Sequence, residues 1–416
     1  MLYTQTFKYQ KRDIFNDPLF ALTLEKINSI CVEFQNQKKE NKFPLLNIPY
    51  QSSDFVEIQE IASRIKDNFA NLVIIGTGGS SLSSKALVNL NIYVNKIKIY
   101  YLENIDPIVT ERFLNQINIE ETAFLIVSKS GKTYETLSLL ALTINKIKKE
   151  FSNYNFSKSF YFITDPTNNP IRNIGQSIGA VILNHDNIGG RFSAFTNVGL
   201  IAASVAGLDP TNIREGAKTV IDDLLNHKER SDISFGSAFV YSMHNHFQNL
   251  VMMAYSDQLI EFTNLYRQIW AESIGKGGFG LTPIPAIGTI DQHSQLQLYL
   301  DGPKDKIFTV IKNTAKGKGL KIDLIDSNEF LGNIANKTIG DIMAAEQDAT
   351  IESLVKNNCP TRIIEMNDLG EHELGALIMK FMLETIIVSR LKDINPFDQP
   401  AVENNKILIE QNLCSV

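Results

Sequence analysis

The chain has 416 residues, which is enough for two domains of ordinary size. Hydrophobic residues make up 44% and charged residues 21%, as is typical of a globular protein, and the net charge of −6 argues against nucleic-acid binding through overall charge. The three cysteines are widely separated and fit neither a disulfide framework nor zinc spacing, so a reducing, cytoplasmic compartment is expected. The sequence shows neither the pattern of a secretory leader nor an apolar stretch of about 18 residues, so neither export nor membrane insertion is expected.

The first part of the chain has helical spacing of its apolar residues. Residues 19–34 and 55–65 place them three or four positions apart, which predicts two helices. Between them, 35–42 and 44–49 are polar or contain proline and are predicted to be a surface loop. Residues 1–65 are therefore expected to form an N-terminal helical segment.

From about residue 71, short apolar runs alternate with helical patterns. This alternation predicts βαβ units in two doubly wound parallel sheets flanked by helices, a fold of the α/β class. The predicted strands are residues 72–75, 97–102, 123–127, 160–163, 181–183, 250–255, 307–311 and 362–365. We expect domains at 66–212 and 213–394, and a tail at 395–416 because Pro396 and Pro400 stop the last helix.

Residues 76–81, Gly-Thr-Gly-Gly-Ser-Ser, stand between a predicted strand and a predicted helix. Free N–H groups at a helix N-terminus, with small residues around them, favour phosphate. A dinucleotide-binding loop is the alternative, but Ser81 stands where its third glycine belongs, and only Glu103 keeps that alternative open.

A second loop, residues 128–133, reads Ser-Lys-Ser-Gly-Lys-Thr after another predicted strand. A nucleoside-triphosphate loop needs glycine where Ile126 stands, so that interpretation fails. The hydroxyls of Ser128, Ser130 and Thr133 can each donate to an anionic oxygen, which favours a phosphomonoester ligand over a plain capped helix.

Three later segments carry further candidate residues. Glu272 lies among apolar and amide side chains ahead of a glycine-rich run, although an isolated surface glutamate is usually just solvated. Arg191 follows two glycines, and His293 lies in a polar loop. The spacing of His244 and His246 does not suit a metal, and no metal site is predicted. The remaining histidines, His185, His227 and His372, are interpreted as surface residues.

Taken together, these motifs resemble the phosphoglucose isomerase family, in its shorter bacterial form, over nearly the whole chain. The matching segments are residues 78–81, 128–133, 189–193, 268–276, 291–294 and 397–400. The resemblance implies two sugar-isomerase (SIS) domains and interconversion of glucose 6-phosphate and fructose 6-phosphate without a cofactor, in glycolysis and gluconeogenesis.

The resemblance also implies a role for each matched residue. Glu272 would move a proton between C1 and C2 through a cis-enediol, and Arg191 would stabilise its charge. His293 would open the sugar ring, assisted by Lys406. The residues implied in binding phosphate are Gly79, Ser80, Ser128, Lys129, Ser130 and Thr133, and those implied in lining the sugar pocket are Gln268 and Gln399.

The family further implies a homodimer in which His293 reaches the site of the neighbouring subunit. This sequence departs from the family pattern at Thr77, Ser83, Ser84, Lys132, Ala401 and the pair at 404–405. Lys132 adds a positive charge to the second loop, whereas Ala401 and the pair at 404–405 change the segment before Lys406 but keep its spacing.

Three other functions stay open from the sequence. A bifunctional phosphoglucose and phosphomannose isomerase would differ only in the shape of the pocket around C2. A non-catalytic sugar-phosphate sensor of the SIS type would leave Glu272, Arg191 and His293 without a purpose. An NAD-dependent dehydrogenase is disfavoured by the broken glycine fingerprint.

Overall fold

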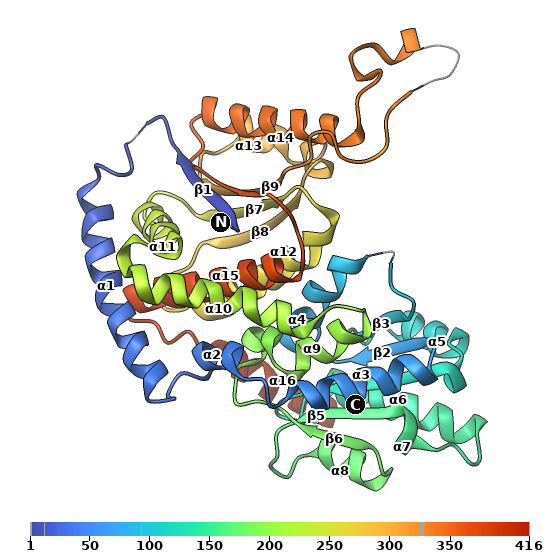
Figure 1. Cartoon of the computed structure of the whole chain (residues 1–416). Helices are drawn as coiled ribbons and strands as arrows, with labels where there is room; N and C mark the ends of the chain where they lie inside the picture. The colour runs from blue at the N-terminus through green and yellow to red at the C-terminus, as the bar shows by residue number, and fades with distance from the viewer. Residues whose placement is uncertain (1, 12, 93, 324–327, 416) are drawn as a thin grey trace.

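The computed structural model describes residues 2–11, 13–92, 94–323 and 328–415, with only the backbone described at 328 and 330. Its two five-stranded sheets each belong to a separate α/β lobe, and helices lie between and around the lobes (Figure 1). The predicted α/β architecture is confirmed.

The first sheet is parallel throughout and has the strand order β3-β2-β4-β5-β6. Its strands are β2 (Asn71–Ile75), β3 (Lys98–Leu102), β4 (Thr122–Val127), β5 (Phe160–Thr164) and β6 (Val181–Asn184). Its helices are α3 (Phe55–Asn68), α4 (Gly79–Val88), α5 (Pro107–Gln116), α6 (Tyr134–Glu150), α7 (Phe156–Ser159), α8 (Pro170–Ser177) and α9 (Asn197–Val205). All five predicted strands of this sheet are present, and β2, β4 and β5 are buried along their whole length because helices cover both faces.

The second sheet has the order β8-β7-β9-β10-β1. Its strands are β7 (Asn249–Ala254), β8 (Thr282–Ile287), β9 (Lys306–Asn313), β10 (Thr361–Met366) and β1 (Tyr3–Lys8). Three of these were predicted, and β1 and β8 were not. The expectation of a wholly parallel second sheet is wrong at one edge, because β1 runs antiparallel to β10 and pairs Tyr3 with Met366.

The N-terminal segment therefore differs from the purely helical one predicted. Besides β1, it contains α1 (Pro18–Lys39), α2 (Pro44–Asn47) and the 3-10 turn η1 (Ile48–Tyr50). The predicted surface loop at 44–49 is wrong, since Leu45, Leu46 and Ile48 are buried. These three apolar side chains join the core through two short helical turns that spacing alone cannot reveal.

Helices α10 (Pro210–His227), α12 (Ile260–Ile274) and α15 (Glu371–Leu391) lie between the two sheets. Helix α15 packs against α10 and α12, and α12 also packs against α4 of the first lobe. This packing brings the end of α12 close to the loops of the first sheet. In the part of the chain that is described, no helix is both long and apolar enough to cross a membrane.

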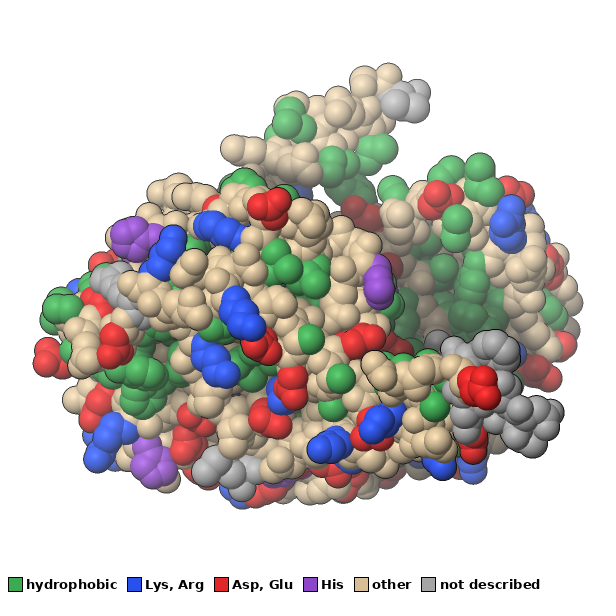
Figure 2. Space-filling model, turned by 90° about the horizontal axis from the view of Figure 1, so that it is seen from above, with side chains coloured by type: hydrophobic (Ala, Val, Ile, Leu, Met, Phe, Trp, Pro, Cys, Tyr) green, Lys and Arg blue, Asp and Glu red, His purple; other side chains and the backbone are tan. Residues whose placement is uncertain are grey.

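The predicted tail is instead the turn η9 (Pro400–Val402) followed by α16 (Glu403–Cys414), which buries none of its residues. It projects from the body as the arm at the top of Figure 2. The remaining helices and turns are α11 (Asp232–Met243), α13 (Leu296–Asp301), α14 (Ile339–Lys356), η2 (Asn89–Asn91), η3 (Ile119–Glu121), η4 (Gly190–Phe195), η5 (Lys228–Arg230), η6 (Asp257–Leu259), η7 (Ile290–Gln292) and η8 (Asn328–Ile334).

Candidate active site

The two predicted phosphate loops lie side by side at the carboxyl edge of the first sheet. Loop 76–81 follows β2 and loop 128–133 follows β4, and these two strands pair in parallel. A Cβ atom on Gly76 would lie 2.9 Å from the carbonyl oxygen of Val127, so the loops leave the sheet in contact. The order of the sheet reverses between β2 and β4, which is where open α/β sheets bind ligands.

The second loop gathers its hydroxyls ahead of α6. The Ser128 and Thr133 hydroxyl oxygens are 3.3 Å apart, and the Gly131 N–H donates to Ser128 Oγ at 3.2 Å. Ser130 Oγ accepts from the Lys132 N–H at 3.3 Å, and Lys129 Nζ donates to the carbonyl of Ile188. Since hydroxyls can rotate, the same groups can donate to an anion placed at the start of α6.

The first loop contacts the segment that carries Arg191. Gly78 has φ of 58°, and a Cβ on Gly79 would lie 2.2 Å from the carbonyl carbon of Gly190, so only glycine fits at the start of α4. Ser83, one of the departures from the family pattern, reinforces this contact. Its hydroxyl lies 3.2 Å from that of Ser193.

Arg191 lies at the centre of the site. It is only 5% exposed, and each of its five N–H groups has an acceptor. Two acceptors belong to α12, Glu272 Oε2 at 2.9 Å from Nη1 and Ser273 Oγ at 2.8 Å from Nε. The other three belong to the chain after α15, namely Gln399 Oε1 at 3.1 Å, Pro396 O at 2.5 Å and Asp398 O at 3.2 Å. Burial lowers the pKa of Arg191, and the carboxylate of Glu272 opposes that shift.

Glu272 is held through both carboxylate oxygens. Oε2 accepts from Arg191, and Oε1 accepts from Gln268 Nε2 at 2.8 Å. Gln268 also faces the first loop, because a Cβ on Gly78 would lie 2.9 Å from Gln268 Nε2. The predicted residues Arg191, Gln268, Glu272 and Gln399 are thus brought together beside the first phosphate loop.

The site also contains residues that the sequence analysis did not single out individually. Arg214 on α10 is 1% exposed, pairs with both carboxylate oxygens of Asp54 at 2.7 and 2.5 Å, and donates twice to the carbonyl of Phe195 at the end of η4. It therefore anchors the turn on which Arg191 lies. Ser273, Lys276 and Asp398 lie within segments that the family resemblance had marked, and that was the available signal.

Two predicted catalytic residues lie outside this cluster. His293 follows η7, beyond the edge strand β8, and is exposed. Lys406 lies on the projecting helix α16, where its ammonium pairs with Glu403 Oε1 at 2.7 Å and its side chain is 61% exposed. Among the described residues, no hydrogen bond or ion pair joins either side chain to Arg191 or Glu272.

The interpretation of His185 as a surface residue is wrong. It is 4% exposed, its Nδ1 lies 2.6 Å from the carbonyl of Asp186, and burial lowers its pKa. The residue follows β6 at the carboxyl edge of the sheet, where helices close over the chain. Within the described ranges, no group of three or more His, Cys, Asp or Glu side chains is arranged to hold a metal ion.

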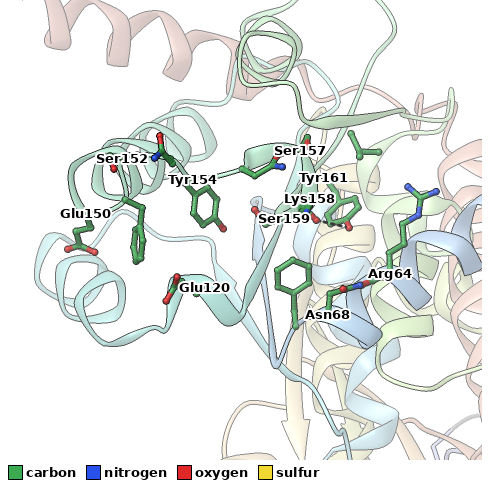
Figure 3. Close-up of a pocket in the computed structure, with 15 residues that line it drawn as sticks. Arg64, Asn68, Glu120, Glu150, Ser152, Tyr154, Ser157, Lys158, Ser159 and Tyr161 are labelled. Atoms are coloured by element: carbon green, nitrogen blue, oxygen red, sulfur yellow. Dashed lines mark hydrogen bonds between the residues drawn. The ribbon is translucent and has the colours of Figure 1, made fainter.

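A cavity of about 890 Å³ is separate from this cluster (Figure 3). Its lining includes Arg64, Glu120, Tyr154 and Lys158, and it opens at the amino ends of β4, β5 and β6. Ligands of open parallel sheets bind at the opposite, carboxyl edge. The cluster around Arg191 is therefore the candidate active site.

Comparisons with known proteins identify one family. A family model described as phosphoglucose isomerase matches residues 53–414. A probable glucose-6-phosphate isomerase of Methanococcus maripaludis is 33% identical, covering 94% of this chain and 89% of the relative. The glucose-6-phosphate isomerase of Campylobacter jejuni is 34% identical, covering 89% and 90%.

Solved structures support the fold. A hypothetical protein from Thermus thermophilus superposes with a TM-score of 0.87 at 26% identity, covering 99% of this chain and all of the other. A glucose-6-phosphate isomerase from Chlamydia trachomatis superposes with a TM-score of 0.84 at 21% identity, covering 99% of this chain and 88% of the other. At that identity the similarity supports the fold alone.

Proposed function

This chain belongs to the phosphoglucose isomerase family, and we propose that the cluster around Arg191 and Glu272 is where it interconverts glucose 6-phosphate and fructose 6-phosphate. Its relatives are named glucose-6-phosphate isomerases, so the activity is that of an aldose–ketose isomerase. The observation that carries the location is the Glu272–Arg191 pair beside two hydroxyl-lined loops.

The substrate's phosphate binds at the carboxyl edge of the first sheet in this proposal. The loop hydroxyls of Ser128, Ser130 and Thr133, with Lys129 beside them, donate to its oxygens at the start of α6. Gly79 and Ser80 contribute from the start of α4, where the helix N-terminus favours negative charge. The sugar then extends from these loops toward Gln268 and Gln399.

Glu272 is the base that carries the proton between C1 and C2. Its charge is at first paired with Arg191, and when Glu272 takes the proton, the negative charge moves to the enediolate of the substrate. The guanidinium, which stays protonated, then stabilises that charge without any change in its own position. Gln268 holds Glu272 Oε1, so the carboxylate keeps its orientation through the transfer.

Ring opening is assigned to His293 of the neighbouring subunit in a homodimer, with Lys406 assisting. The exposure of His293 and the absence of buried residues in α16 support an arrangement in which a second subunit completes the site. The proposal also includes the domain limits 66–212 and 213–394 and a cytoplasmic location. The latter rests on the three unpaired cysteines.

The proposal is tested by following conversion of fructose 6-phosphate into glucose 6-phosphate by the purified protein in the presence of a chelator, with a coupled dehydrogenase. Glu272→Gln is expected to lower kcat by about 10³-fold or more, because the amide cannot accept the proton. Binding of the substrate is expected to persist, since the phosphate loops are intact.

Glu261→Gln is the matched control, because Glu261 lies on the same helix and contacts Asn264 rather than Arg191. It is expected to keep wild-type activity. Turnover by Glu272→Gln at the wild-type rate would rule out the assigned base, and a wild-type protein without activity would rule out the function itself.

A further inference from the structure

The chain between α15 and η9 passes directly over Arg191. We call residues 395–399 the strap. It contains no helix or strand, yet it supplies three of the five acceptors of the buried guanidinium, through Pro396, Asp398 and Gln399. The position of Arg191 relative to Glu272 therefore depends on where the strap lies.

The strap has few attachments of its own. The ring of Phe397 packs edge-on against Phe192 and Phe43, with centroids 5.7 and 5.6 Å away, but 44% of this side chain is still exposed. Asn395 and Asp398 bond to each other at 3.0 Å, which shapes the strap without attaching it to the body. The strap also bonds to the Arg191 side chain, but these aromatic contacts are not directional, so a second directional contact would help to set the position of the strap.

Lys276 provides that contact from the end of α12. Its ammonium donates to Asp398 Oδ1 at 2.7 Å and to the carbonyl of Asn395, and its side chain is only 16% exposed. Lys276 follows Glu272 by four residues, and backbone bonds in both directions between Lys276 and Phe279 make its turn rigid. The turn that directly follows the helix of the base thus also holds the strap.

We propose that Lys276 is a positioning residue, which holds the strap so that Arg191 and Gln399 face Glu272. The inference rests on the proposed function of this site. Lys276 reaches the reacting atoms only through the strap, so its loss should change the geometry of the transition state more than the binding of the phosphate. The phosphate loops follow strands of the first sheet, whereas Lys276 follows α12 and bonds to the strap.

The test compares Lys276→Met with Lys312→Met. Lys312 has nearly the same setting, 17% exposed and 2.9 Å from Asp348 Oδ1, but it lies on β9 away from the strap. Lys276→Met is expected to lower kcat by about 10²-fold and to leave KM within about threefold. Lys276→Arg, which keeps a charged donor, is expected to recover most of the loss, and Lys312→Met is expected to keep wild-type kcat.

Amide hydrogen exchange gives a readout independent of turnover. The peptide containing the strap should exchange at least about tenfold faster in Lys276→Met and unchanged in Lys312→Met. If Lys276→Met does not fold, Asp398→Asn takes its place, because the Asp398 substitution removes the negative charge that Lys276 binds.

Two results would overturn the inference: a kcat within twofold of wild type, or a fall in kcat with no change in exchange of the strap. An equal loss in Lys312→Met would do so as well. An inactive wild-type protein would refute the proposed function instead, which keeps the two failures distinct.

Discussion

Arg191 shows how the chemistry of this site is divided among its residues. With all five donors already bonded, it cannot gain a hydrogen bond to the substrate without giving one up. In the proposed mechanism it therefore stabilises the enediolate by its fixed charge, in a place where burial makes that charge effective. The same saturation makes the site sensitive to every group that accepts from Arg191.

Lys380 on α15 gives a pH-dependent prediction away from the site. Its side chain is fully buried near Glu384 and Arg362, and burial lowers its pKa to about 8. An unfolded lysine has a pKa of about 10.4, so between these values the unfolded chain binds more protons, and this group makes stability rise with pH.

Lys380→Met should therefore be more stable than wild type at pH 7 by roughly 1–3 kcal/mol, because the cost of burying a charge is removed. The advantage should fade between about pH 8 and 10.4, as wild-type Lys380 loses its proton. Urea denaturation of both proteins across this pH range measures the difference in the free energy of unfolding. A difference that is constant with pH would contradict the assignment.

For individual residues, the sequence predicted that Arg191, Gln268, Glu272 and Gln399 share one site, because each lies in a segment that resembles a known family. It could not predict that Ser273 and Asp398 share one guanidinium, since that contact joins positions far apart in the chain. His185 was misjudged because polar neighbours in sequence do not report the helices that bury a residue.

Among the elements, strands that are buried on both faces were predicted well, because their apolar runs are short and are bounded by small or polar residues. The two missed strands both lie at sheet edges. Pro283 and Pro285 interrupt β8, and proline is tolerated there because an edge strand has one unpaired side. Strand β1 alternates more buried and exposed side chains over only six positions, and its three successive polar residues hide that pattern in the sequence.

The Arg214–Asp54 pair connects three elements, α3, α10 and η4, and makes a prediction about stability. Asp54→Asn should lower the free energy of unfolding by roughly 1–3 kcal/mol, because the buried guanidinium loses the carboxylate to which it donates twice. Glu60→Gln on the same helix, in a pair 3.7 Å apart and 60% exposed on both sides, should change it by less than about 1 kcal/mol.

Chemical denaturation measures both changes. Equal effects of the two substitutions would mean that the Arg214 pair contributes no more than a surface contact. A loss confined to Asp54→Asn would confirm that the turn carrying Arg191 depends on this charge pair.

For the molecule as a whole, the proposed homodimer predicts complementation between inactive variants. In a mixed dimer of Glu272→Gln and His293→Ala, one site combines an intact Glu272 with an intact His293 from the other subunit. Random exchange of subunits should restore about a quarter of wild-type activity, since half of the dimers are mixed and each has one working site.

The measurement is turnover after the two variants are unfolded and refolded together, with each variant refolded alone as the control. No recovery from a mixture shown to contain mixed dimers would place His293 in the same subunit as its Glu272.

The pairing of β1 with β10 has a consequence for how the protein is made. The two sheets are wound alike, but the second takes its last strand from the start of the chain, so the entire first lobe is inserted between paired strands. On the ribosome, β1 emerges before the first lobe, and its partner β10 emerges only after that lobe. The first lobe can complete its core during synthesis, whereas the second sheet must wait until β10 has been made, with β1 left unpaired until then.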